Sequence, residues 1–204
     1  VANLQLYAQL LAEQPLTPQG QRCAQAIAAQ SEKLQALMEA LVKSSRLETG
    51  ILALHPEPGP LSPTVERAAA QYLSKAQAKQ IRLSVGQMRG SALFDPKWTE
   101  EALCNLLDNA VKYTPAGGRV SVEIRPYEMF TAVCVQDTGP GIPEAEQAKI
   151  FGRFYRAPSA YQTEGVGIGL YLTRQIAAGQ GGYIKVESSP GAGSIFSLYL
   201  PRES

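Results

Sequence analysis

Two asparagines and two nearby polar side chains form the first group in this sequence that could do chemistry. In "CNLLDNAVKYTP" (104–115), Asn105 and Asn109 are four residues apart, and Lys112 and Tyr113 follow Asn109 after three and four residues. These spacings place all four side chains on one face of a helix. An amide oxygen is a suitable Mg²⁺ ligand where phosphate oxygens complete the coordination. The face therefore indicates a site for a metal and an anion.

A glycine turn after a predicted strand forms a second group. In "DTGPGIP" (137–143), Asp137 ends the strand and Gly139 and Gly141 permit tight turns before Ile142. A carboxylate in an apolar setting accepts a hydrogen bond from an exocyclic amino group such as that of adenine. The alternative is an ordinary turn capped by the aspartate side chain.

Alternating glycines form a third group. "EGVGIGLYLTRQIA" (164–177) places Gly165, Gly167 and Gly169, separated by Val166 and Ile168, just before a predicted helix that continues with Leu170. Free N–H groups at a helix N-terminus suit phosphate oxygens. No strand directly precedes this run and no Gly-Lys-Ser/Thr follows, so it matches neither a dinucleotide-binding fingerprint nor a P-loop.

A long irregular segment joins the second and third groups. "IFGRFYRAPSAYQTEG" (150–165) combines aromatic residues with two arginines and is a candidate lid. Its candidate binding residues are Phe151, Arg153, Phe154 and Arg156. The arginines and Lys112 could neutralise phosphate charge. A last glycine turn in "PGAGSIFSLYLP" (190–201) places Ser194 at the start of a strand, and an ordinary hairpin is its alternative. Together the groups predict a Mg²⁺–ATP site without a P-loop, with Asn109 as the metal ligand.

The elements that would position these groups are helices and strands in mixed order. Helical patterns cover 63–79, 96–113 and 169–178, and strand patterns cover 81–85, 119–125, 130–137, 183–188 and 194–200. Short turns make 119–125/130–137 and 183–188/194–200 antiparallel hairpins. We therefore expect an α+β fold for residues 64–204, with helices over one face of a mixed sheet.

Residues 1–48 are predicted to form two helices, separated by a Pro- and Gly-rich break at 12–20. In the second helix, Ile27, Leu34 and Leu41 are seven residues apart, which is the spacing of a bundle seam. We expect this hairpin to pair with a second copy as a dimeric four-helix bundle; packing on its own C-terminal domain is the alternative. Residues 49–63 are interpreted as a linker.

Composition excludes several function classes. The 204 residues carry a net charge of +1, and no apolar run approaches the roughly 18 residues of a membrane span, so we expect neither a nucleic-acid partner nor direct membrane contact. Cys23, Cys104 and Cys134 are far apart and are interpreted as buried, inert thiols. The single histidine, His55, precedes a proline and is interpreted as a surface or packing residue, so a catalytic triad or a zinc site is not expected.

The order of these motifs resembles the catalytic domain of sensor histidine kinases, in the GHKL (Bergerat) superfamily that also includes gyrase and Hsp90. "NLLDNAVKYTP" resembles the N box, "DTGPGIP" the G1 box, "FGRFYR" the F box and "GVGIGL" the G2 box. The resemblance implies Mg²⁺ binding at Asn109, adenine recognition at Asp137 and glycine boxes that frame a lid. It also implies a cytoplasmic kinase core of a membrane-anchored bacterial sensor, a homodimer through residues 1–48, and a response-regulator receiver domain as partner.

Two departures bear on activity. ATP-hydrolysing members of the superfamily resemble one another in a glutamate four residues before the metal-binding asparagine, and here that residue is Asn105, which cannot act as a general base. This favours phosphoryl transfer over hydrolysis. The phosphoacceptor motif His-Glu/Asp-x-x-x-Pro-Leu is absent, so we expect the acceptor histidine to lie upstream of Val1 and the chain alone not to autophosphorylate. The alternatives are a degenerate, non-enzymatic dimerisation module, or another ATPase or serine kinase of the superfamily.

Overall fold

The computed structural model describes Tyr7, Leu11 and residues 17–48, 54–157 and 165–202, and the chain divides into two compact units, Val1–Ser45 and Arg46–Ser204. Helix α2 (Pro18–Glu48) confirms the second predicted helix of the N-terminal region. It begins where Pro18 presets a helical φ and the Thr17 hydroxyl accepts a hydrogen bond from the Gly20 N–H at 3.2 Å. Tyr7 and Leu11 are helical, and the rest of the first predicted helix lies outside the described residues.

Three apolar side chains of α2 that are spaced seven residues apart are exposed in the described structure. Ile27 and Leu34 are each 44% exposed and Leu41 is 50% exposed. The expectation of a buried Cys23 is wrong, because this residue lies on an exposed part of α2, where a single helix covers few of its own side chains. Cys134 is buried and Cys104 is half-buried.

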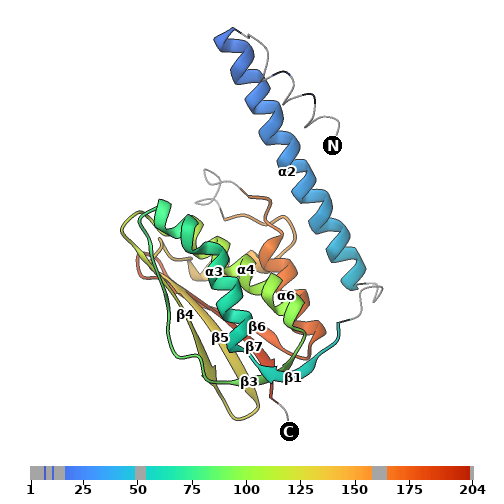
Figure 1. The fold of residues 1–204 in the computed structure, drawn as a ribbon, viewed down its shortest axis with the longest axis vertical. Coiled ribbons are helices and arrows are strands. Elements are labelled where there is room, and N and C mark those ends of the chain that lie inside the picture. Colours follow the sequence, from blue (N-terminus) through green and yellow to red (C-terminus); the bar gives the residue numbers. More distant parts are fainter. Residues whose placement is uncertain (1–6, 8–10, 12–16, 49–53, 158–164, 203–204) are drawn as a thin grey trace. The chain divides into compact units, whose positions relative to one another are not determined.

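The larger unit has two layers (Figure 1). Its sheet has the strand order β2-β4-β5-β7-β6. The strands are β2 (Arg82–Val85), β4 (Arg119–Pro126), β5 (Phe130–Asp137), β6 (Tyr183–Ser189) and β7 (Gly193–Pro201). Strand β2 is parallel to β4 and the other pairs are antiparallel, which confirms the mixed sheet and both predicted hairpins. Helices α3 (Ser62–Ala78), α4 (Pro96–Tyr113) and α6 (Gly169–Gly179) cover one face, so the α+β prediction is confirmed.

A second, two-stranded sheet differs from the sequence expectation. Strand β1 (Glu57–Pro60) pairs antiparallel with β3 (Ser91–Phe94), although 49–63 was interpreted as a linker. Two prolines are tolerated in β1 because it is an edge strand, where fewer N–H groups must pair. Leu61 directly after it is fully buried. The larger unit therefore recruits part of the predicted linker into its core.

Helix α4 holds the first polar group because its two faces differ in character. Leu103, Leu106 and Leu107 are buried on the side that meets the sheet. Val120 and Val122 of β4 are fully buried in the same core. Each such side chain contributes about 1.5–3 kcal/mol on burial. This apolar face fixes the rotation of α4, so its polar stripe must point away from the sheet.

Both ends of α4 are defined by local sequence. Asp95 is the N-cap, and its Oδ1 accepts hydrogen bonds from the N–H groups of Lys97 and Trp98 at 3.0 and 3.2 Å. Pro96 at the first helical position completes the predicted start. The helix ends at Tyr113 because Thr114 precedes a proline and adopts an extended conformation.

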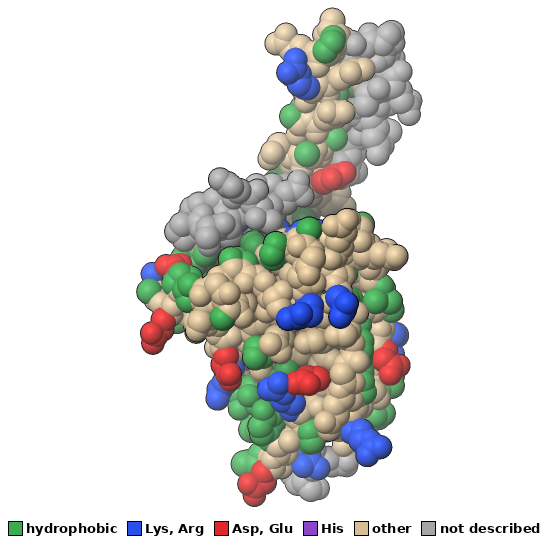
Figure 2. Space-filling model, turned by 90° about the vertical axis from the view of Figure 1, so that its left-hand side faces the viewer, with side chains coloured by type: hydrophobic (Ala, Val, Ile, Leu, Met, Phe, Trp, Pro, Cys, Tyr) green, Lys and Arg blue, Asp and Glu red, His purple; other side chains and the backbone are tan. Residues whose placement is uncertain are grey.

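The distribution of charged side chains on the surface (Figure 2) agrees with the near-neutral net charge of the sequence. On the face shown in Figure 2, basic and acidic side chains are interspersed rather than gathered by sign. None of the described helices combines the length and the apolar character needed to cross a membrane. His55 is exposed and only its backbone N–H contacts the Asp95 carboxylate, at 3.0 Å, which confirms the surface interpretation.

Candidate nucleotide-binding site

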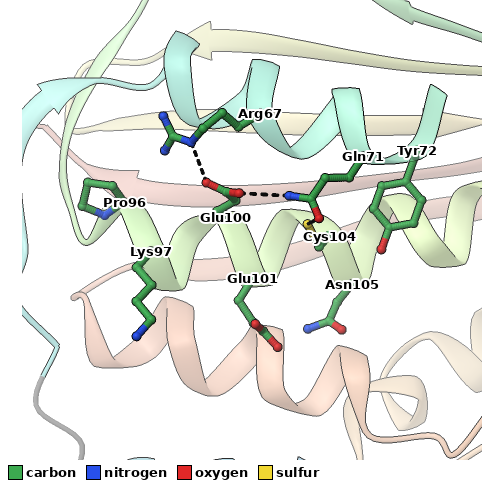
Figure 3. A pocket seen from close by; sticks show the side chains of 9 residues that line it. All are labelled: Arg67, Gln71, Tyr72, Pro96, Lys97, Glu100, Glu101, Cys104 and Asn105. Atoms are coloured by element: carbon green, nitrogen blue, oxygen red, sulfur yellow. Dashed lines mark hydrogen bonds and ion pairs between the residues drawn. The ribbon is translucent and has the colours of Figure 1, made fainter. Parts of the chain in front are cut away.

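The polar stripe of α4 faces the start of α6. Asn105, Asn109, Lys112 and Tyr113 are all half-buried, as expected for side chains on the wall of a site. Asn105 projects toward α6 (Figure 3), and a Cβ at Gly169 would lie 3.2 Å from its Oδ1. The Asn105 Nδ2 is buried without a hydrogen-bond partner. An unpaired buried donor is costly, so this amide is available for an acceptor in a ligand or a water.

Asp137 lies at the C-terminal end of β5 and is only 5% exposed. Its Oδ1 accepts a hydrogen bond from the Gly139 N–H at 2.7 Å. Burial raises the pKa of this carboxyl group, and hydrogen bonds from the backbone N–H groups of Gly139 and Ser194 oppose the rise. Such a partly desolvated acceptor suits a neutral N–H donor.

The loop that contains Gly139, Gly141 and Ile142 is pressed against two other segments. A Cβ at Gly139 would lie 3.3 Å from the Tyr113 carbonyl oxygen of α4. Gly141 has φ +73°, and a Cβ there would overlap the Ser189 carbonyl oxygen. On the other side, Ser194 is buried and is the cross-strand neighbour of Asp137. The structure thus brings Gly139 to the C-terminal end of α4, Gly141 to the end of β6, and Ser194 beside Asp137.

The alternating glycines approach α4 and the candidate lid closely. A Cβ at Gly165 would lie 2.6 Å from the Lys112 Nζ, and one at Gly167, where φ is +74°, would lie 2.6 Å from the Tyr155 carbonyl oxygen. Ile168 is buried and Leu170 is half-buried, so both anchor this segment. Glycine is required where backbone meets backbone at this distance.

The lid residues divide into packing residues and exposed residues. Phe151 ends the short 3-10 helix η1 (Lys149–Phe151) and packs edge-to-face against Phe196 in the core, which gives it a packing role. Phe154 is 47% exposed. The Arg153 guanidinium lies 4.9 Å from the centre of the Tyr171 ring. Residues 158–164 of the lid prediction lie outside the described residues.

Arg156 reaches the α4 side of the site. Burial raises the pKa of the Tyr113 phenol, and the positive charge of Arg156 opposes that rise. The two groups are therefore near enough to interact electrostatically. Three segments therefore reach the last turn of α4. They are the loop with Gly139, the lid with Arg156 and the segment with Gly165.

A groove of about 650 Å³ adjoins the site on the α3–α4 surface (Figure 3). Its polar groups largely pair with one another: Glu100 contacts Arg67 at 2.8 Å and Gln71 at 2.9 Å. The Gln71 amide oxygen also accepts from the Cys104 thiol at 3.6 Å. Burial, with nearby Glu100, raises the pKa of Cys104 to about 11, so this thiol stays protonated and inert at neutral pH. Several polar groups that line the groove are therefore already hydrogen-bonded to one another.

The residues present fit a magnesium–nucleotide complex rather than a protein-only metal centre. Within the described part of the chain, no three His, Cys, Asp or Glu side chains converge to hold a metal ion. Mg²⁺ in nucleotide sites takes one or two protein oxygens and completes its shell with phosphate and water. A single amide such as that of Asn109, on the half-buried polar stripe of α4, is compatible with that coordination.

Residues 94–204 match the family "Histidine kinase-, DNA gyrase B-, and HSP90-like ATPase". Because this match covers more than half of the chain, the chain belongs to that ATPase family. Its curated relatives include proteins named as sensory kinases and histidine kinases. It is 37% identical over 175 residues to the adaptive-response sensory kinase SasA of a Synechococcus species, with 84% of this chain and 46% of that protein covered. It is 33% identical over 196 residues to the circadian input-output histidine kinase CikA of Synechococcus elongatus, with 93% and 26% covered.

Solved structures agree with the sequence comparison. Full-length ShkA in complex with AMPPNP is 26% identical, with a TM-score of 0.78, 97% of this chain covered and 42% of that one. The mycobacterial sensor histidine kinase MprB is 28% identical, with a TM-score of 0.66, 72% of this chain covered and 100% of that one. The chain spans between a quarter and a half of the length of the two curated relatives.

Three residues that support the site are not among the predicted site residues. Ser188 and Gln147 connect the loop after β5 to strand β6. Gln180 connects the start of α4 to the end of α6, because its side-chain oxygen accepts from the Asp95 N–H at 2.5 Å and its amide donates to the Ile176 carbonyl at 3.1 Å. Their partners are distant in sequence, so only the folded chain identifies them.

Proposed function

We propose that this chain is the kinase core of a two-component sensor histidine kinase. It binds Mg²⁺–ATP and transfers the γ-phosphoryl group to a histidine on a segment outside this chain, from which a response-regulator aspartate then takes it. The observation that carries the proposal is the convergence of three separate segments, the loop after β5, the lid and the glycine segment, on the last turn of α4 in a chain of this ATPase family.

Each group at the site has a role in this proposal. Asp137 accepts a hydrogen bond from the adenine amino group, because it is a buried acceptor directly before a glycine turn. Asn109 supplies an amide oxygen to Mg²⁺, which when bound neutralises charge on the phosphates. Lys112 and the lid arginines, Arg153 and Arg156, contact phosphate oxygens. The backbone N–H groups at the start of α6 face the same anion.

Asn105 favours transfer over hydrolysis. Its side chain lies against Gly169 at the start of α6, one helical turn before Asn109. A neutral amide cannot remove a proton from water, so a bound nucleotide would persist until an acceptor arrives. The unpaired Asn105 Nδ2 can instead donate to a ligand oxygen or to a water.

The N-terminal unit is proposed to dimerise through α2. The exposed seam of Ile27, Leu34 and Leu41 repeats every seven residues, and a second copy would bury it in a four-helix bundle. As part of a membrane-anchored sensor, this core would work in the cytoplasm and meet a receiver domain there. Residues 1–48 are the proposed hairpin, and the proposed catalytic domain of residues 64–204 also includes the part of the predicted linker from Glu57 onward.

One feature favours a second candidate, a degenerate module that binds nucleotide and dimerises without phosphorylating itself. The only histidine of the 204 residues is His55, which is exposed and precedes β1 rather than lying on a hairpin helix. The two candidates differ in whether a longer form of the protein carries an acceptor.

The test uses γ-labelled ATP with this chain, with a form extended upstream by its native sequence, and with Asn109→Ala in the extended form. We expect acid-labile, base-stable label only on the extended chain, and none on the Asn109→Ala variant, which should lose Mg²⁺-dependent ATP binding while keeping its circular dichroism spectrum. Absence of label on an extended chain that binds ATP supports the degenerate module. Undiminished ATP affinity in folded Asn109→Ala refutes the metal assignment.

A further inference from the structure

One hydroxyl group joins the two segments that flank Asp137. Ser188 lies near the end of β6, and its Oγ is 2.8 Å from the Ile142 backbone nitrogen. The same Oγ is 2.7 Å from the Gly193 carbonyl oxygen and 3.0 Å from the Ser194 Oγ. The loop after β5 and the start of β7 therefore meet at a single side chain of a third segment.

The chemistry of these partners settles the direction of each hydrogen bond. A serine hydroxyl has one hydrogen to donate and two lone pairs that accept. The Gly193 carbonyl can only accept, so the Ser188 hydrogen points to it. The Ile142 N–H can only donate, so it uses one lone pair, and the Ser194 hydroxyl must then donate to the other. The Ser188 hydroxyl is fully used, and the Ser194 hydrogen is committed to it.

The same two segments supply the backbone donors to Asp137. The Gly139 N–H belongs to the loop after β5 and lies 2.7 Å from the Asp137 Oδ1. The Ser194 N–H belongs to β7 and is the second backbone donor to this carboxylate. The direction in which Asp137 presents its remaining lone pairs thus depends on how these two segments are held relative to each other.

A second contact reinforces the first. The Gln147 amide donates to the Ile142 carbonyl at 3.0 Å and to the Ser188 carbonyl at 2.8 Å. The Gly191 N–H also donates to the Pro140 carbonyl at 2.7 Å. The loop after β5 therefore cannot shift by a fraction of an ångström without lengthening several of these hydrogen bonds.

We propose that Ser188 is a positioning residue for purine recognition: it touches no ligand, and it sets the orientation of Asp137 toward an exocyclic amino group by joining residues 139–142 to residues 193–194. This inference rests on the proposed nucleotide-binding function of the same site. It assigns to Ser188 a role in discriminating between purines, beyond a role in general stability.

The test compares Ser188→Ala with Ser188→Thr, which keeps the hydroxyl, and with Ser189→Ala, a neighbouring exposed serine. Affinities for ATP and for purine riboside triphosphate, which lacks the amino group, are measured by calorimetry, and the melting temperature is measured without nucleotide. We expect Ser188→Ala to weaken ATP about tenfold and the analogue by less than about twofold, because one well-placed hydrogen bond is at stake. Ser188→Thr and Ser189→Ala should keep the wild-type ratio of the two affinities.

If Ser188→Ala leaves the ratio of the ATP and analogue affinities unchanged, whether or not both affinities fall, the positioning role is overturned and the proposed function stands. Failure of the wild-type chain to bind either nucleotide overturns the proposed function and this inference together. If Ser188→Ala does not fold, Gln147→Ala removes the second contact from the other segment and should lower the same ratio; an unchanged ratio there overturns the inference.

Discussion

Replacing Gly167 by alanine tests whether the contact between the glycine segment and the lid is needed for nucleotide binding. Gly167 has φ +74°, and an added Cβ would lie 2.6 Å from the Tyr155 carbonyl oxygen and 2.9 Å from the Phe154 carbonyl carbon. Backbone atoms cannot rotate away as a flexible side chain can. Residues 154–156 and 167 must therefore separate to admit the methyl group.

The size of the effect has two parts. A left-handed backbone costs an alanine about 1–2 kcal/mol relative to glycine. Restoring an ordinary contact requires a displacement on the order of 0.5–1 Å, and misplacement by about 1 Å can cost on the order of 100-fold in a site that depends on alignment. Because the displaced segment carries Arg156, we expect ATP affinity to fall by at least about tenfold.

Gly117→Ala is the matched control, because Gly117 has φ +80° and its Cβ would meet nothing within 4 Å. Both variants should lose stability in urea unfolding because of the left-handed backbone, Gly167→Ala by more because of its added clash, and only Gly167→Ala should lose ATP affinity in calorimetry. Equal ATP affinities for the two variants would show that the lid contact is irrelevant to binding and would refute the reasoning.

Two further substitutions test the buried polar groups. The native pKa of Asp137 is raised above its ordinary value of 3.8, so its stabilising contribution is complete below that value and is lost as pH rises through the native pKa. Asp137→Asn should therefore gain stability relative to wild type between pH 4 and pH 7 in urea unfolding while losing adenine selectivity; a constant difference between the two proteins would contradict the shift. Gln180→Ala leaves the buried Asp95 N–H without its partner at 2.5 Å. This should lower the free energy of unfolding by about 3 kcal/mol and Tm by about 6–12 °C. The control Gln77→Ala, at an exposed residue, should change Tm little, and equal melting temperatures for the two variants would count against the role of Gln180.

Local sequence was sufficient where an element carries its own start and stop signals. Helix α4 occupies the predicted range 96–113, because an Asp-Pro cap begins it and the Thr-Pro step after Tyr113 ends it. The hairpin of β4 and β5 follows from alternating apolar residues on either side of a short turn. These signals act within a few residues of the structure that they determine.

Sequence reasoning failed where pairing is remote and the segment is short. Strand β1 has four residues and two prolines, and it is a strand only because β3 lies beside it. Cys23 follows Gln21 and Arg22 and lies on an exposed face of α2, although Ala24 beside it is buried. For β1 the deciding contact is with residues far along the chain, and for Cys23 it is the side of the helix on which the residue lies.

The sequence by itself determined the chemistry available to this protein: amides four residues apart on one helix, a carboxylate before a glycine turn, and glycines before a second helix. It also determined the absence of a glutamate at position 105. Only the tertiary structure decided how these groups meet, through the closeness of Gly165 to Lys112 and the joining of two loops at Ser188. The physical reason is one of range. Periodicity and capping act over one or two helical turns, whereas the pairing of buried hydrogen-bonding groups and close backbone contacts depend on segments that the sheet brings together.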